Sequence, residues 1–268
     1  VSTSTDNSVT FDSTAPSVTF EQGGAQADPT NNLPITFAVV FSEAIDAATF
    51  IASDINNSGT APGTVFTIVN SGDNQNFTVT ANGLSGDGTV VPSLPGGRVD
   101  DNAGNSNNAS TSVDNSVTYD SASPTVTVEQ SGSQADPTNS TTISYTVTFS
   151  AAIDPATFTR ADITQGGTAT GVTWNNPTTA DNITWTLTTA TVTGDGTVLP
   201  SIATNAVSDP AGNGNAASTS TDNSVSFDTS GPTVTVEQAA TQTDPTNSTA
   251  IVYTATFSEA IDPASINS

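Results

Sequence analysis

The sequence repeats itself at a fixed interval of 108 residues, and this interval constrains the fold more than any other feature. The motif Asp-Asn-Ser-Val begins at Asp6, Asp114 and Asp222, and each copy continues into an aromatic residue followed by Asp. A repeat of this length is a whole domain, because the unit of a solenoid is only about 20–50 residues long. We therefore predict an array built from one type of domain.

The repeat also predicts the domain boundaries. Residues 1–12 match the last strand of a preceding unit, 13–120 and 121–228 are complete units, and 229–268 match the opening strands of a further unit. The simplest interpretation is an excerpt from a longer repetitive chain. On that interpretation the lack of a signal peptide in this segment does not bear on targeting.

The charge of the chain excludes several classes of partner. There are 26 acidic residues against two basic ones, Arg98 and Arg160, and the formal net charge is −24. Nucleic acid binding depends on Lys and Arg, and an anionic membrane surface also attracts basic segments, so neither partner is expected. Small cations are the natural partners, although an acidic balance can also serve solvation alone. Without Cys or His, disulfides and thiolate or imidazole metal sites are excluded.

Apolar residues alternate with polar ones in a pattern typical of β-strands. The clearest stretch is 35–41, with copies at 143–149 and 251–257. Further strands are expected at 63–69, 76–81, 88–94, 108–119 and 124–129, with copies one interval away. A short helical turn is expected at Asp154-Pro155, which places a capping Asp before a Pro. About seven short strands in each unit predict an all-β fold of tandem immunoglobulin-like sandwiches arranged end to end.

The apolar side chains at these positions are expected to fill two cores rather than to bind a ligand. The first core should contain Phe20, Ile35, Phe37, Val39, Phe41, Phe50 and Phe77. The second should contain Val126, Ile143, Tyr145, Val147, Phe149, Phe158 and Trp185.

Three segments of the first unit resemble bacterial immunoglobulin-like repeats. They are 12–16 (Asp-Ser-Thr-Ala-Pro), 41–46 (Phe-Ser-Glu-Ala-Ile-Asp) and 101–105 (Asp-Asn-Ala-Gly-Asn). The resemblance covers the whole chain, and such repeats form the extender regions of giant surface adhesins and related filamentous proteins. It implies an extracellular or cell-surface location on a bacterium, and it implies calcium at the junctions between domains.

Strand directions predict which loops meet. Consecutive strands of a sandwich run in opposite directions, so alternate loops share a pole. The loops 42–46 and 100–107 should lie at the N-terminal pole, beside the linker residue Asp12. The turns 28–31 and 86–88 should lie at the opposite pole. Stacking the units should bring Asp120, Asp154, Asp209, Asn213 and Asp28 toward the junction between the two complete units.

Calcium takes six to eight oxygen ligands, which clusters of Asp and Asn supply. Magnesium fits less well because it keeps more waters, and zinc and copper favour His or Cys. The candidate ligands are Asp12, Asp120, Asp228, Glu43, Asp46, Asp154, Asp101, Asn105, Asp209, Asn213, Asp28 and Asp136. The same residues also suit turns and helix caps without any metal. Ala151 stands in the second unit where the first has Glu43, which would weaken that site.

Catalysis is disfavoured because the chain has no His, Cys or Lys, although a pair of carboxylates remains a formal possibility. The predicted function is a structural stalk or filament, stiffened by calcium, whose partners are neighbouring repeats and copies of itself. The alternative is a tandem module of an adhesin that binds a glycan or another surface. An extender within one long chain and a polymer of shorter chains both remain open.

Overall fold

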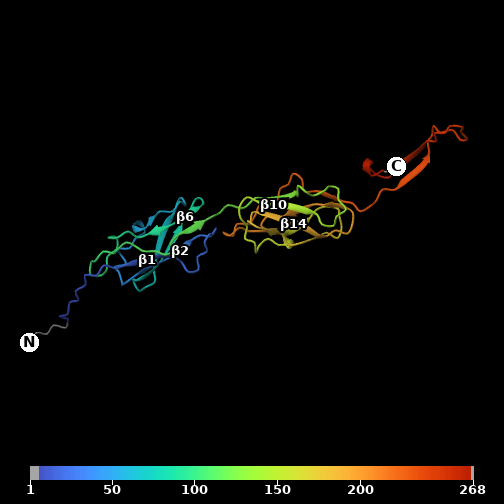
Figure 1. Ribbon diagram of the computed structural model, residues 1–268. Helices are drawn as coiled ribbons and strands as arrows, with labels where there is room; N and C mark the ends of the chain where they lie inside the picture. The colour runs from blue at the N-terminus through green and yellow to red at the C-terminus, as the bar shows by residue number, and fades with distance from the viewer. Residues whose placement is uncertain (1–5, 267–268) are drawn as a thin grey trace, which may run out of the picture.

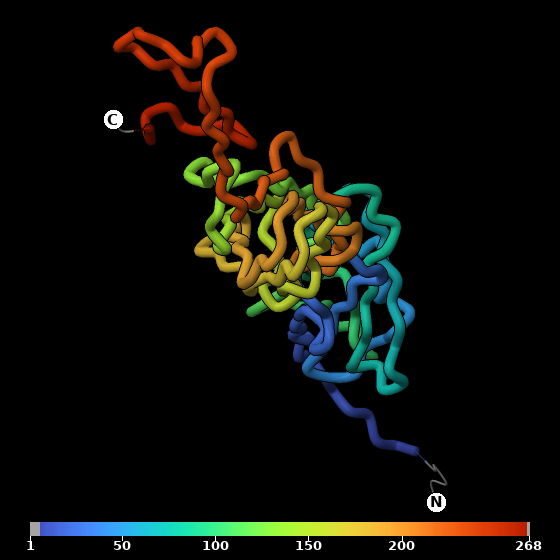
Figure 2. Tube along the Cα trace, turned by 90° about the vertical axis from the view of Figure 1, so that its right-hand side faces the viewer, coloured from blue at the N-terminus to red at the C-terminus, as the bar shows by residue number. Residues whose placement is uncertain are grey.

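The computed structural model describes residues 6–266, and within that range it contains strands and short 3-10 turns but no α-helix. Two β-sandwich units follow one another along the chain, and a small two-stranded sheet lies beyond them. Figures 1 and 2 show these three bodies in succession in both views. The all-β, end-to-end architecture expected from the repeat is confirmed. None of the described helical segments has the length and apolar character needed to cross a membrane.

The main sheet of the first unit has four antiparallel strands in the order β1-β2-β5-β4. They are β1 (Val18–Gln22), β2 (Ile35–Phe41), β5 (Asn76–Asn82) and β4 (Val65–Asn70). Phe37 of β2 pairs with Gln22 on one side and with Val79 on the other. Alternate residues of β2 are buried, which is the consequence of the period-two pattern in its sequence.

The opposite face of the first unit is built from two short pairs. They are β3 (Asn56–Asn57) with β7 (Pro92–Ser93), and β6 (Gly88–Val90) with β8 (Val117–Tyr119). The continuous strand predicted at 108–119 is wrong, because β8 begins only at Val117. Before that point the chain runs beside β1, where Thr111 forms a parallel bridge with Thr19. The segment changes sheets between these two pairings, so it is not one strand.

The second unit repeats this plan. Its main sheet runs β12-β14-β10-β9, with β13 also paired to β14. The strands are β9 (Val126–Gln130), β10 (Ser144–Phe149), β12 (Thr173–Trp174), β13 (Thr178–Thr179) and β14 (Thr184–Thr191). The opposite face pairs β11 (Ile163–Gln165) with β16 (Pro200–Ile202), and β15 (Gly196–Val198) with β17 (Val225–Phe227).

All fourteen predicted core residues are buried, and they fall into two separate clusters. In the first unit Phe77 lies edge-on to Phe41 and Phe50, with ring centroids 5.8 and 5.3 Å apart. In the second unit Trp185 takes the place of Phe77 and lies 5.1 Å from Phe158. Such edge-to-face pairs add to the free energy of burial. Each unit therefore has its own aromatic centre.

The turn expected at Asp154-Pro155 forms in every copy, but it extends into a 3-10 helix only in the third segment. In the second unit these residues make a hydrogen-bonded turn, and the 3-10 helix η2 (Arg160–Asp162) comes later. The first unit likewise has η1 (Ala52–Asp54) after its turn. In the third segment, Asp262 does cap the 3-10 helix η3 (Pro263–Ser265). The Asp-Pro pair thus closes a turn in the second unit and in the third segment, but it does not by itself produce the helix.

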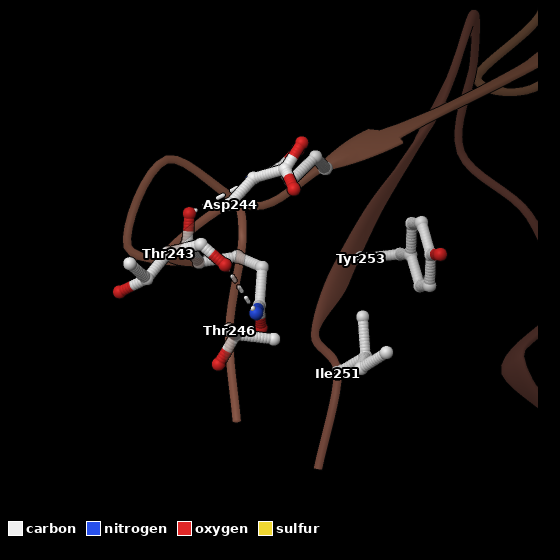
Figure 3. Close-up of a pocket in the computed structure, with 7 residues that line it drawn as sticks. Thr243, Asp244, Thr246, Ile251 and Tyr253 are labelled. Atoms are coloured by element: carbon white, nitrogen blue, oxygen red, sulfur yellow. Dashed lines mark hydrogen bonds between the residues drawn. The ribbon is translucent and has the colours of Figure 1, made fainter. Parts of the chain in front are cut away.

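The third body consists of β18 (Val234–Gln238) paired with β19 (Tyr253–Phe257). A pocket of about 170 Å³ lies between its 238–246 loop and Tyr253 (Figure 3). In the second unit the equivalent loop is covered by β17. The contact is seen in Asp136, whose carboxylate accepts a hydrogen bond from the amide of Ser226 in that strand. Tyr253 is 63% exposed, whereas its counterpart Tyr145 is 1% exposed. The pocket is therefore the uncovered side of a core and not a built ligand site.

We predict that the two cores unfold separately. Both tryptophans, Trp174 and Trp185, lie in the second core, so tryptophan fluorescence reports on that unit alone. Phe77→Ala should destabilise the first unit by about 3–5 kcal/mol, because it removes a buried aromatic ring. In urea, circular dichroism should show an earlier transition while the fluorescence midpoint stays in place. The exposed control Val69→Ala should change neither, and a parallel shift of both signals would contradict separate unfolding.

Candidate functional site

The N-terminal pole of the first unit gathers two loops and the linker that precedes them. Ile45 forms an antiparallel bridge with Asp101, and the amide of Asp46 donates to the carbonyl of Asp100 at 2.9 Å. The Asn105 side chain donates to the carbonyl of Asp12 at 3.3 Å. The loops 42–46 and 100–107 therefore meet beside Asp12, as the strand directions predict.

Three carboxylates face one another at this pole. One oxygen from each of Asp12, Glu43 and Asp101 lies within 4.8 Å of the others. Asp12 is exposed, Glu43 is half-buried and Asp101 is buried. They line an open hollow of about 400 Å³ together with Thr10, Ala44, Asn102 and Ala103. Oxygen ligands at this separation suit a hard divalent cation such as calcium.

The electrostatics of the three groups differ. The side-chain amide of Asn105 and then its backbone amide, both 2.8 Å from Asp101, hold the pKa of the Asp101 carboxyl below its usual range. Burial, followed by the charges of Asp12 and Asp101, raises the pKa of Glu43. Asp101 is thus a fixed anion, and Glu43 carries the cost of bringing a further negative charge beside it.

The junction between the two complete units repeats part of this arrangement. The Asn213 side chain donates to the carbonyl of Asp120 at 2.9 Å and to the carboxylate of Asp209 at 3.0 Å. Ala151 occupies the position of Glu43 and offers no oxygen ligand. Among residues 6–266, a group of three acidic ligands is found only at the first junction.

The other candidate ligands are engaged in turns and strand contacts. Asp46 and Asp154 each accept a hydrogen bond from the amide two residues ahead, at 3.0 Å. Asp228 does the same toward Ser230 at 2.8 Å. Asp28 and Asp136 accept from the last strand of their own unit, at 2.9 and 2.8 Å. These contacts neither require nor exclude a metal ion, so metal binding by these residues stays a prediction.

Sequence reasoning missed the residue that reaches across the middle junction. Asn31 donates through its side chain to Asn213 and through its backbone amide to the carbonyl of Ala211, both at 3.1 Å. The neighbouring Asp28, which was expected at this junction, contacts its own unit instead. The repeated motif Asp-Pro-Thr-Asn could have indicated this contact. Its last residue, and not its first, faces the next unit.

The linker itself is held by the turn 86–88, which the sequence predicts at the pole opposite Asp12. The Asp87 carboxylate accepts from the amide and the hydroxyl of Ser121, at 2.8 and 2.7 Å. That hydroxyl and then the amide lower the pKa of Asp87. Asp195 holds Thr229 in the same way, with its amide at 2.9 Å. The Gly-Asp-Gly motif therefore fixes the start of each linker.

A second missed carboxylate fixes the irregular stretch before the last strand. Glu21 accepts from the amides of Val113 and Asp114, at 2.9 and 2.8 Å. The Asp114 amide is the main cause that lowers the pKa of Glu21. Glu129 makes the equivalent contacts in the second unit. This side chain replaces the strand hydrogen bonds where the segment changes sheets.

Comparisons with known proteins add only distant structural likenesses. No protein-family model matches the chain, and no curated protein matches it significantly. Similar solved structures include the Escherichia coli adhesin FdeC, at 14% identity and a TM-score of 0.37, covering 85% of this chain and 68% of that one. The N-terminal part of the bacterial S-layer protein SbsC has 16% identity and a TM-score of 0.27, covering 80% and 44%. Yersinia pseudotuberculosis InvD has 16% identity and a TM-score of 0.35, covering 85% and 63%.

The chain thus spans less than two thirds of the SbsC and InvD structures. At these levels of similarity no residue role is transferred.

We predict that Glu21→Gln destabilises the first unit at neutral pH by about 1–2 kcal/mol, since it weakens hydrogen bonds to a charged acceptor. The folded pKa of Glu21 is lowered. Its contribution is therefore present above the ordinary pKa of Glu, about 4.3, and disappears as the pH falls through the folded pKa. Urea unfolding followed by circular dichroism at neutral and at strongly acidic pH should show the difference only at neutral pH.

Glu237→Gln is the matched control, because Glu237 is the equivalent residue of the third segment and, among the described residues, its carboxylate accepts no hydrogen bond. It should leave the stability of the first unit unchanged. An equal loss for Glu21→Gln at both pH values would mean that its role is packing and not charge.

Proposed function

We propose that the chain is a section of an extracellular stalk or filament on a bacterial surface, built from tandem immunoglobulin-like units. The observation that carries the proposal is the linker between the two complete units, which is hydrogen bonded at both of its sides. Asp87 of the first unit holds Ser121, and Asn213 of the second unit holds the carbonyl of Asp120. A linker held in this way transmits the direction of one unit to the next.

The regularity of the repeat supports a spacer rather than a binding module. Every landmark motif of the first unit returns one interval later without insertion or deletion. Binding sites usually involve loops that differ from one copy to another on a common scaffold. The resemblance to bacterial immunoglobulin-like repeats agrees with a stalk. A net charge of −24 would also keep neighbouring chains apart in solution.

Calcium at the first junction is part of the same proposal. Asp12 belongs to the linker, whereas Glu43 and Asp101 belong to the following unit. A cation bound by all three would tie the linker to the unit and would offset their mutual repulsion. The equivalent acids Asp120 and Asp209 at the next junction would bind it more weakly, because the third carboxylate is missing there.

Glu43→Gln should change stability in opposite directions with and without calcium. The folded pKa of Glu43 is raised, so its charged form costs stability when no cation is bound. In chelator, the variant should therefore melt at a higher temperature than the unsubstituted chain. In calcium at a hundredfold excess over Kd, the unsubstituted chain should gain about 2.7 kcal/mol, and the variant should lose most of that gain.

Glu259→Gln is the control for this measurement. Glu259 is the equivalent residue of the third segment, where no counterpart of Asp101 is present among the described residues. It should respond to calcium as the unsubstituted chain does. A melting temperature of the unsubstituted chain that is the same in calcium and in chelator would refute the metal clamp.

The stalk itself is tested by small-angle X-ray scattering of the 268-residue chain. A rod gives a pair-distance distribution with a peak at the width of one unit and a long tail. A compact distribution would contradict the stalk. Saturable binding of a glycan to the chain would instead favour the alternative of a ligand-binding module.

A further inference from the structure

The middle junction contains a direct contact between the two complete units. Asn31 lies at the C-terminal pole of the first unit, and its side-chain amide donates to the Oδ1 atom of Asn213 at 3.1 Å. Its backbone amide donates to the carbonyl of Ala211, also at 3.1 Å. Two hydrogen bonds from one residue to neighbouring residues of the partner unit fix an orientation as well as a distance.

The loop that receives Asn31 is shaped for close approach. Gly212 has a φ of +93°, a conformation that side chains disfavour, and its position brings Asn31 to within 3.5 Å of where a Cβ would lie. Asn213 is buried, at 7% exposure. Its Nδ2 atom donates to Asp120 and to Asp209, and its Oδ1 atom accepts from Asn31. Buried amides require such partners, so the contact satisfies a group that would otherwise be costly.

The same junction is poorly suited to a cation. Ala151 removes the third carboxylate. Asp209 is 4% exposed, and its two oxygens accept from the backbone and side-chain amides of Asn213 at 2.8 and 3.0 Å. Asp101 of the first junction is held by Asn105 in the same way, so the hydrogen bonds of Asp209 do not set the two junctions apart. The differences at the middle junction are the missing third carboxylate and the Asn213 Oδ1 atom, which accepts from Asn31.

We propose that the Asn31–Asn213 contact is a head-to-tail interface that holds the two complete units in a fixed orientation without a bound cation. The inference rests on the proposed stalk, because it explains the stiffness of one junction. It differs from the calcium clamp at Asp12, Glu43 and Asp101, so one chain contains a cation-responsive junction and a cation-independent one. The second copy of the repeat is itself the partner that this surface recognises.

The test measures the orientation of the units directly. The chain has no cysteine, so Thr78→Cys and Thr148→Cys introduce one labelling site in each complete unit. Both positions are exposed to solvent, on β5 and on β10. Pulsed electron spin resonance then gives the distribution of distances across the middle junction in calcium and in chelator. We expect one narrow distribution in both conditions.

Asn31→Ala should abolish the narrow distribution in both conditions, since small interfaces between domains move by default. Asn31→Asp is a second variant of the same size, and it should do likewise because the carboxylate cannot donate to Asn213. Asn31 lies outside both apolar clusters, so circular dichroism should show that each variant remains folded. Asn139→Ala is the matched control at the equivalent position of the second unit, and it should keep the distribution narrow.

Two results would overturn the inference. A distribution that is broad in chelator and narrow only in calcium would show that a cation holds this junction. A distribution that stays narrow in Asn31→Ala would show that the contact does not hold it. Neither result bears on the calcium clamp at the first junction, which the melting behaviour of Glu43→Gln tests separately.

Discussion

The structure depends on how an acidic chain without lysine satisfies its carboxylates. With two arginines for 26 acids, ion pairs cannot do so, and backbone amides take their place. Glu21 fixes the stretch before the last strand, Asp87 fixes the linker, and Asp101 closes the loop at the N-terminal pole. Hydrogen bonds to a charged acceptor are stronger than neutral ones. The acids are therefore internal supports of the loops and linkers, and only a minority are available to a cation.

Apolar and polar contacts therefore determine different properties of the chain. Each core is closed within its own unit, and no buried apolar cluster extends across the junction. The cores consequently determine the fold of a unit but not the direction of the next one. That direction is set by a few polar contacts, of which Asn31–Asn213 and Asp87–Ser121 are the clearest. A small number of substitutions outside the cores can thus change the mechanics of the chain and leave its fold intact.

The sequence predicted what depends on periodicity and missed what depends on a single long-range donor. The positions of Phe37 and Trp185 in the cores followed from alternation along a strand, and the meeting of Asp12 with Asp101 followed from strand direction. The break in the 108–119 strand did not, because it requires Glu21 to reach amides that are 92 and 93 residues away. Asn31, and not Asp28, contacts the next unit at the junction. Which of the two does so depends on the direction in which a four-residue turn presents its side chains, and spacing along the sequence does not encode that direction.

The repeat also separates what the units share from what distinguishes their junctions. The residue after the serine that follows the second strand is Glu43 in the first unit, Ala151 in the second and Glu259 in the third. Its surroundings in the first two units are otherwise alike, since Asn105 and Asn213 hold equivalent aspartates in the same way. Under the proposed calcium clamp, loss of that one acid removes both a ligand and a repulsive charge. A junction without it then has no repulsion for a cation to offset. Variation at a single position would therefore be sufficient to give neighbouring junctions of one array different responses to calcium.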